Sequence, residues 1–151
     1  MKLDSFDIAI LSKLTKNARS SVNEIAEEVA LSPSAVSRRL SALERGGAIR
    51  SYTALLDGNA IGLPLTVFVD IRLKTMGDDE LSKFEAVVTT LPNVIDCHLM
   101  SGDVDYMMRV RAKDMAHYEE FFRKHLSTLP GVERITTRFG MRSLNIEGGI
   151  S

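Results

Sequence analysis

The sequence is poor in the residues that support covalent or metal chemistry. It has one cysteine, Cys97, in 151 residues, and no tryptophan. A single cysteine cannot form an internal disulfide, and without a CxxC partner it does not indicate a zinc or redox site. We interpret Cys97 as a small buried apolar side chain. No run approaches the ~18 apolar residues of a membrane span, and the N-terminus is acidic and periodic, so we expect a cytoplasmic protein without a membrane partner.

Catalytic and cofactor motifs are also absent from the sequence. The three histidines, His98, His117 and His125, lack the HxxxH and HExxH spacings of metal sites. There is no GxSxG elbow, no GxGxxG after a strand and no Walker loop. We therefore expect no metal, no cofactor and no enzymatic activity.

The net charge of −1 is low for a nucleic-acid binder, but it conceals a division along the chain. Residues 1–50 contain eight Lys/Arg and six Asp/Glu (8 − 6 = +2), whereas residues 51–151 contain eleven and fourteen (11 − 14 = −3). The basic excess lies at the N-terminus and is small. Only its placement on the folded chain can indicate a partner.

The N-terminal third predicts three short helices. Residues 6–14 are apolar at helical spacing after a capping aspartate, Asp4. Ser21 and Glu24 have the spacing of a capping box for a second helix. Ser32 followed by proline starts a third helix, which should stop near the glycines at 46–47. The short turn between the second and third helices is typical of a helix-turn-helix.

On the third helix, Val36, Leu40 and Leu43 form one stripe that must face the other helices. The opposite face carries hydroxyls and guanidiniums, which suit a DNA groove because small residues allow close approach and arginine reaches bases or phosphates. A solvated amphipathic helix is the alternative, but the helix-turn-helix context favours DNA. For Arg39, on the flank, a phosphate contact and an ion pair with Glu44 or Glu24 remain open. The candidate DNA-binding residues are Ser32, Ser34, Ser37, Arg38, Arg39, Ser41 and Arg45.

The remaining chain predicts an α/β domain. Residues 49–56 look like an extended linker strand that ends in turn formers, and residues 65–73 alternate as a half-buried strand. A helix that opens at Gly77, with Leu81, Phe84, Val87, Val88 and Leu91 inward, precedes strands at about 94–101 and 106–113. Asp114 then caps a helix lined by Met115, Tyr118, Phe121, Phe122 and Leu126, before a last strand from 132 to about 144.

The resulting order is βαββαβ, and the chain marks it twice. Leu91-Pro92-Asn93-Val94 and Leu129-Pro130-Gly131-Val132 are matching helix-to-strand junctions. Two helices on one face leave the other face of a four-stranded antiparallel sheet uncovered. We therefore expect the chain to dimerise.

The turn at residues 101–106 crowds two aspartates and a glycine between two strands. Its backbone N–H groups can hold a carboxylate and an aspartate can accept from an ammonium, which suits an amino acid. An ordinary hairpin turn is the competing interpretation. Arg134, Arg138 and Arg142 share one face of the last strand, where a solvated basic row is the default.

These residues resemble the leucine-responsive/asparagine-responsive family, the Lrp/AsnC or feast/famine regulators, over nearly the whole chain. The matching segments are Leu3-Asp4 through Asp7, Ile10-Leu11, Leu14, Asn17-Ala18-Arg19, residues 26–33, Val36-Ser37-Arg38-Arg39-Leu40, Leu43-Glu44, Gly47-Ala48-Ile49, residues 52–57, Cys97-His98-Leu99, Gly102-Asp103-Val104-Asp105-Tyr106, Asp114-Met115 and residues 129–132.

The resemblance implies an α+β protein: a winged helix-turn-helix over residues 1–50, a linker strand and hinge over 51–64, and a ferredoxin-like effector-binding and oligomerisation domain over 65–151. It implies a transcriptional regulator of amino-acid metabolism. Its partners would be a double-stranded DNA operator, a small-molecule effector, often an amino acid, and further copies in dimers, tetramers or octamers. The implied effector residues are Gly102, Asp103, Val104, Asp105, Tyr106, Met115, Arg138, Phe139 and Gly140.

The identity of the effector and the function of the chain each have alternatives. Arg138 and Phe139 are bulky where family members often have smaller residues, so the effector need not be leucine. A siroheme-decarboxylase-like enzyme shares the architecture, but it would call for pocket histidines and tolerate loss of the DNA-facing residues, which are intact here. A ligand-binding assembly module without DNA binding is the third possibility, and an exposed Arg38 beside small residues argues against it.

Overall fold

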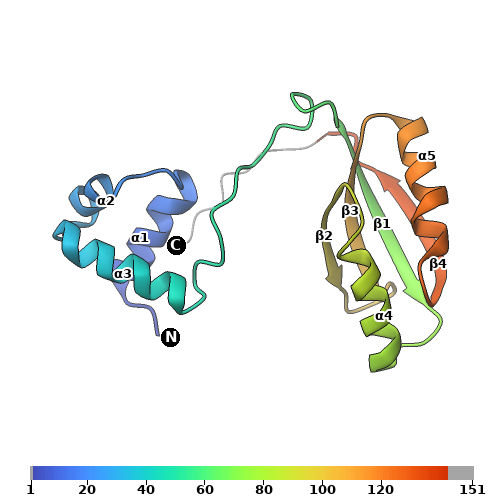
Figure 1. Ribbon diagram of the computed structural model, residues 1–151, viewed down its shortest axis with the longest axis horizontal. Coiled ribbons are helices and arrows are strands. Elements are labelled where there is room, and N and C mark those ends of the chain that lie inside the picture. The colour runs from blue at the N-terminus through green and yellow to red at the C-terminus, as the bar shows by residue number, and fades with distance from the viewer. Residues whose placement is uncertain (1, 143–151) are drawn as a thin grey trace. The chain divides into compact units, whose positions relative to one another are not determined.

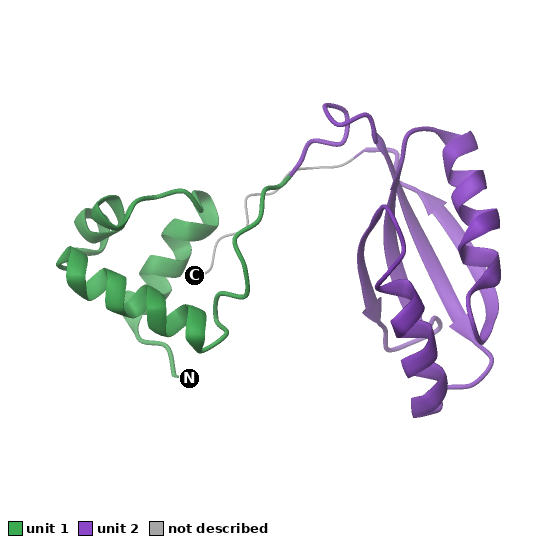
Figure 2. Cartoon of the chain, viewed as in Figure 1, with its two compact units in different colours: residues 1–55, 144–151 green, residues 56–143 purple. Residues whose placement is uncertain are grey.

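The computed structural model describes residues 2–142, which form two compact units. Figure 1 shows helices alone in the N-terminal part and a sheet with helices in the C-terminal part. Figure 2 colours the two units, whose boundary along the chain lies between Leu55 and Leu56. Within the described range, no helix is long and apolar enough to cross a membrane.

Unit 1 is a three-helix domain whose helix starts agree with the sequence prediction. Asp4 and Ser21 form complete capping boxes, and Ser32 accepts a hydrogen bond from the backbone N–H of Ala35, with proline at the first helical position. These caps satisfy N–H groups that a helix start otherwise leaves without a partner. The helices are α1 (Ser5–Lys16), α2 (Val22–Val29) and α3 (Pro33–Arg45).

The core of unit 1 is small and aliphatic. Ile10, Ile25, Val36 and Leu43 are almost completely buried where the three helices meet. Each comes from the apolar stripe of its own helix, so burial of the stripes fixes how α3 is rotated about its axis. The opposite side of α3 must therefore face solvent.

Unit 2 is an α+β sandwich of the ferredoxin-like βαββαβ order, as the sequence predicts. Its four strands form one antiparallel sheet in the order β2-β3-β1-β4. The elements are β1 (Leu65–Leu73), α4 (Asp78–Val88), β2 (Val94–Leu99), β3 (Tyr106–Ala112), α5 (Met115–Lys124), a short 3-10 helix η1 (Leu126–Thr128) and β4 (Val132–Phe139).

One face of this sheet carries the core. Val67, Val69 and Ile71 of β1 are fully buried and belong to the same cluster as Phe84 of α4 and Phe121 of α5. Both helices therefore cover one face. The alternate side chains of the strands point to the other face, which neither helix of unit 2 covers.

The two predicted helix-to-strand junctions have the same geometry. Asn93 has φ 62° and Gly131 has φ 70°, both in the left-handed region that few residues adopt easily. The carbonyl of Asn93 accepts a hydrogen bond from the N–H of Arg111 at 2.9 Å, and that of Gly131 accepts from the N–H of Lys74 at 2.8 Å. Each corner thus anchors its incoming strand to the middle of the sheet.

The predicted linker strand at residues 49–56 is wrong. Ile49 lies in a bend and residues 50–56 belong to no helix or strand, because the described residues offer them no neighbouring strand with which to exchange hydrogen bonds. The predicted ends of three strands also extend too far: β2 ends at Leu99, β3 at Ala112 and β4 at Phe139. The predicted end of the last strand, residue 144, lies outside the described residues.

Two side chains predicted to face the core are exposed instead. Val87 of α4 is 39% exposed and Met115 of α5 is 58% exposed. Met115 is the first residue of its helix, so its side chain lies beyond the end of the helix-sheet contact. Val87 lies at the edge of the apolar stripe, where Phe84 and Val88 already fill the space against the sheet.

Candidate functional site

The turn before α3 is built by local backbone chemistry. Ala30 ends α2 in the left-handed conformation with φ 54°, and Leu31 donates its N–H to the carbonyl of Ala26. The Oγ atoms of Ser32 and Ser34 are 3.1 Å apart, within hydrogen-bonding distance. This turn and the cap at Ser32 set the direction in which α3 runs from the end of α2.

The exposed face of α3 carries most of the residues that the sequence proposes for DNA binding. Val36 and Leu43 are 0% and 1% exposed, so the helix rotation is the one expected from its apolar stripe. Among residues 2–142, Arg38 and Arg45 have no ion-pair partner. Exposed in the structure are Ser32, Ser34, Ser37, Arg38 and Arg45, whereas Arg39 and Ser41 are half-buried.

Arg39 forms an ion pair, but with different partners from those expected. Its Nη1 atom lies 2.8 Å from Asp4 and 2.7 Å from Asp7, and its guanidinium stands over the ring of Phe6 at 5.4 Å from the centroid. The expected partners, Glu44 and Glu24, are therefore wrong. Both aspartates already form the capping box of α1, so a single cluster caps one helix and ties it to another.

The charges of this cluster stabilise each other. The backbone N–H of Asp7 and the guanidinium of Arg39 hold the pKa of Asp4 below its usual value. The two carboxylates in turn raise the pKa of Arg39, with Asp7 contributing most. Arg39 is thus a fixed, neutralised cation, whereas its neighbour Arg38 has no ion-pair partner in the part of the chain that the structure describes.

The turn between β2 and β3 holds part of the proposed effector site. Gly102 has φ 123°, which glycine adopts readily, and Asp103 is exposed. Asp105 Oδ2 accepts a hydrogen bond from the N–H of Leu73 at 2.7 Å, and the N–H of Asp105 donates to Ile71 at 2.9 Å. Asp105 therefore already serves to join the turn to β1.

The other proposed effector residues do not share one surface. Tyr106 is buried, and its hydroxyl donates to Glu85 at 2.7 Å; burial and Glu85 both raise the pKa of that hydroxyl. Phe139 stacks edge-on against Tyr118 of α5, on the helix side of the sheet. Arg138 lies on the uncovered face, paired with Asp70 at 2.7 Å. Met115 is exposed at the start of α5, and Gly140 donates its N–H to Thr66 at 2.8 Å.

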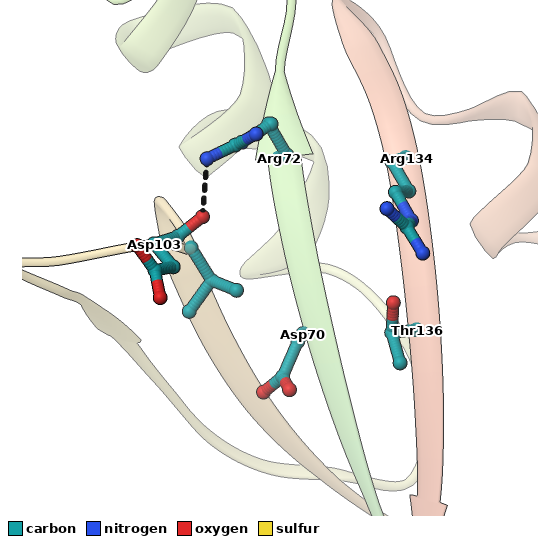
Figure 3. Close-up of a pocket in the computed structure, with 6 residues that line it drawn as sticks. Asp70, Arg72, Asp103, Arg134 and Thr136 are labelled. Atoms are coloured by element: carbon teal, nitrogen blue, oxygen red, sulfur yellow. Dashed lines mark hydrogen bonds between the residues drawn. The ribbon is translucent and has the colours of Figure 1, made fainter.

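A depression of about 410 Å³ lies on the uncovered face beside this turn. Figure 3 shows Arg72 of β1 reaching the backbone oxygen of Asp103, with Arg134 and Thr136 on the neighbouring strand β4. Two of the proposed effector residues, Asp103 and Val104, contribute to it. Its other lining residues are Asp70, Arg72, Arg134 and Thr136.

The sequence argument missed Arg72 and Thr136 as parts of a site. The strand alternation does place Arg72 on the polar side of β1, and Arg134 on the same side of β4 as Arg138. The missing information was the register that sets Arg72 directly opposite Arg134.

Cys97 lies on β2 and is partly buried against the core. Burial raises the pKa of its thiol to about 11, so it is protonated and unreactive near neutral pH. Residues 2–142 contain no cluster of three His, Cys, Asp or Glu side chains suited to a metal ion.

Known proteins resemble the chain along nearly its full length. Residues 3–50 match the family model for a winged helix-turn-helix DNA-binding domain, and residues 66–150 match that of the Lrp/AsnC ligand binding domain. The chain is 36% identical to the Bkd operon transcriptional regulator of Pseudomonas aeruginosa over 95% of its length and 94% of that protein. It is 40% identical to the leucine-responsive regulatory protein of Salmonella typhimurium, covering 89% and 82%.

A solved structure extends this similarity to three dimensions. A transcriptional regulator from Neisseria meningitidis, determined as a complex with L-Met, superposes with a TM-score of 0.90 at 32% identity, covering 99% of the chain and 97% of its own. An AsnC family transcriptional regulator from Agrobacterium tumefaciens gives a TM-score of 0.89 at the same identity and coverage.

Proposed function

The chain belongs to the Lrp/AsnC family of transcriptional regulators, and on this basis we propose that it reads an operator through the exposed face of α3 and changes its activity when an amino acid binds to unit 2. The observation that carries the DNA-binding part is the contrast on α3. Its inner stripe is buried, while the exposed face presents hydroxyls and two guanidiniums, Arg38 and Arg45, that form no ion pair within the described residues 2–142. Such a face suits both phosphates and guanine edges.

We assign the direct DNA contacts to Ser34, Ser37, Arg38, Ser41 and Arg45, with Ser32 at the helix start. Arg39 makes no direct DNA contact in this proposal, because Asp4 and Asp7 neutralise its charge. It would hold α3 against α1 and so fix the angle at which α3 enters the groove.

We propose that three successive segments of the chain have separate functions. Residues 1–50 bind DNA, residues 51–64 connect, and residues 65–151 bind the effector and form the homo-oligomer. The uncovered sheet face supports self-association, because a two-layer sandwich leaves that face open to a second copy.

An amino-acid effector is supported by the regulator from Neisseria meningitidis, which was solved with L-Met. Asp103 and Val104 of the turn line a depression large enough for a molecule of that size. We propose that the chain is not an enzyme, since its relatives are named as regulators, and that it acts in the cytoplasm, where its DNA partner would be.

The DNA-binding proposal is tested by selection. Purified protein is mixed with a random-sequence duplex library, bound duplexes are recovered, and affinity for the enriched sequence is compared with that for a scrambled duplex of the same length. We expect the enriched duplex to bind at least 1,000-fold more tightly, roughly the lower limit of specific recognition. Equal affinity for both duplexes would contradict a role as an operator-binding regulator.

The effector proposal is tested by thermal unfolding in the presence of each of the twenty amino acids. A ligand that binds only the native state raises the melting temperature, by an amount that grows with its concentration over Kd. We expect one or a few amino acids to do so. No shift with any of them would remove the effector part of the proposal and leave the DNA-binding part standing.

A further inference from the structure

A depression of about 370 Å³ lies in unit 1, between the N-terminal segment and α3, and we call it the flank site. It brings Lys2 next to a helix that begins more than thirty residues later. Buried Leu43 and the small, exposed Ala42 contribute apolar surface, and the other lining residues are charged. The complete lining is Lys2, Asp7, Arg38, Arg39, Ala42 and Leu43.

The flank site lies at the side of the face that we assign to DNA. Each residue turns an α-helix by about 100°, so Arg38 and Ala42 lie about 200° and 240° around α3 from Val36, and Arg39 about 300°. Val36 is completely buried, so these angles run from the exposed face back towards the core. The flank site therefore begins at the exposed face, at Arg38, and ends at the packed side of the helix, at Arg39.

A helix in the major groove has a phosphate backbone on each side. The groove is about 12 Å wide and an α-helix with its side chains is about 10–12 Å across, so the sides of the helix come close to both strands. When α3 enters the groove with the face that carries Arg38 and Arg45, the flank site faces one of these strands. The group nearest to it is then a phosphate and not a base edge.

The charge of the flank site suits an anion. Its lining contains three cations and one carboxylate, that of Asp7 (3 − 1 = +2). Asp4 also binds Arg39, and with it the balance is still positive (3 − 2 = +1). Both aspartates lie against Arg39, at 2.8 and 2.7 Å, so the excess belongs to Lys2 and Arg38. Neither of these two forms an ion pair within residues 2–142.

We propose that the flank site receives one phosphate of the operator backbone and that Lys2 binds this phosphate. An ammonium group and a phosphodiester form a charge-assisted contact, and the long, flexible stem of lysine suits a phosphate as a point charge. Arg38 lies at the rim, between this phosphate and the base edges, while Arg39 stays with its two aspartates as the inner wall. The N-terminal segment is thus a second contact that positions α3 on the duplex without reading sequence.

The inference rests on the proposed DNA-binding function and adds a residue outside α3. The test uses the full-length protein and the selected and scrambled duplexes. Fluorescence anisotropy gives the affinities at several salt concentrations for wild type, Lys2→Gln, Lys2→Arg and Lys13→Gln. Lys13→Gln is the matched control: it removes the same charge from unit 1, but Lys13 is already bound to Glu28 of α2.

Lys2→Gln should lower the slope of log affinity against log salt by about 0.9 for each bound protomer, so its deficit relative to wild type should shrink roughly 3.5-fold when salt is raised fourfold. The deficit should be equal on both duplexes, because a phosphate contact carries no sequence information. Lys2→Arg should keep the wild-type slope, and Lys13→Gln should change it by less than about 0.3. Equal melting temperatures of wild type and Lys2→Gln would show that the variant is folded.

A second measurement locates the phosphate. Neutral methylphosphonates replace the phosphates of the selected duplex one at a time. At one position for each bound protomer, this change should weaken wild type but not Lys2→Gln, because the variant no longer uses that charge and the two losses are not additive.

Three results would overturn the inference. One is an unchanged slope in Lys2→Gln while wild type still prefers the selected duplex, which leaves operator binding intact and removes Lys2 from the interface. Another is an equal fall of the slope in Lys13→Gln, which would assign the effect to overall charge. The third is a loss confined to the selected duplex, which would make Lys2 a base contact. If wild type binds both duplexes equally, operator recognition fails, and the salt slopes on the scrambled duplex still decide whether Lys2 binds a phosphate.

Discussion

Arg38 and Arg39 are adjacent arginines for which the structure implies opposite behaviour toward DNA. The perturbation is replacement of each by alanine in the full-length chain. Arg38 is exposed and has no ion-pair partner among residues 2–142, so its charge is available to a duplex. Arg39 is already bound by Asp4 at 2.8 Å and by Asp7 at 2.7 Å, and only 27% of its side chain is exposed.

The magnitudes follow from counterion release. Each cation that neutralises a phosphate adds about 0.9 to the slope of log affinity against log salt, so raising salt fourfold weakens that contact by a further factor of roughly 3.5. Arg38→Ala should lower this slope by about 0.9 for each Arg38 side chain that contacts a phosphate. If Arg38 contacts a guanine edge instead, the loss is about 1–3 kcal/mol on the selected sequence and the slope changes little.

The assay is a fluorescence-anisotropy titration of the selected and scrambled duplexes at several salt concentrations. Arg39→Ala is the control: it should leave the salt slope unchanged, although it lowers the melting temperature by breaking the tie between α1 and α3. The reasoning is refuted if Arg39→Ala lowers the slope as much as Arg38→Ala, or if Arg38→Ala alters neither slope nor affinity for the selected duplex.

Three further outcomes are expected. Helix caps hold the pKa values of Asp4 and Glu24 below their ordinary 3.8 and 4.5, so the stability that the two carboxylates provide is complete above those values and is lost as pH falls below about 4. Circular dichroism should therefore show acid unfolding at a higher pH in Ser21→Ala, which lacks one cap. An unshifted unfolding midpoint would contradict this. Phe84→Ala removes a fully buried ring 4.5 Å from that of Tyr106 and should cost about 3–5 kcal/mol in urea unfolding, whereas a loss below 1 kcal/mol would mean that the core collapses around the cavity. Asp105→Ala should abolish the effector response and leave DNA binding intact. It should also lower the free energy of unfolding by about 1–3 kcal/mol, because the N–H of Leu73 loses its hydrogen-bond acceptor. A normal effector response would reduce Asp105 to a structural role.

The parts of the fold that depend on local chemistry could be predicted. Caps at Asp4, Ser21 and Ser32 act within three or four residues, so their spacing alone fixes where helices begin. The alternation of β1 works in the same way, because burial of one face forces a period of two. Rotation of α3, and with it the exposure of Arg38, follows from its apolar stripe.

The contacts that depend on residues far away in the sequence could not be predicted. Arg39 binds two aspartates more than thirty residues away, and nothing local distinguishes them from Glu44 or Glu24. Residues 49–56 have the composition of a strand, but composition does not supply a neighbour to pair with. The opposition of Arg72 and Arg134 depends on strand register, which is set only when the whole sheet assembles.

The paired corners at Asn93 and Gly131 have a consequence for how the chain tolerates change. At both positions φ is positive, so the backbone limits which amino acids are acceptable, and at Gly131 an added Cβ would meet no atom within 4 Å. A library of all substitutions should therefore give nearly the same short set of survivors at each corner, with glycine and asparagine first and β-branched residues last. Two positions so far apart in the sequence would then show matching mutational profiles, and the twofold repeat of this domain would be visible in fitness data alone.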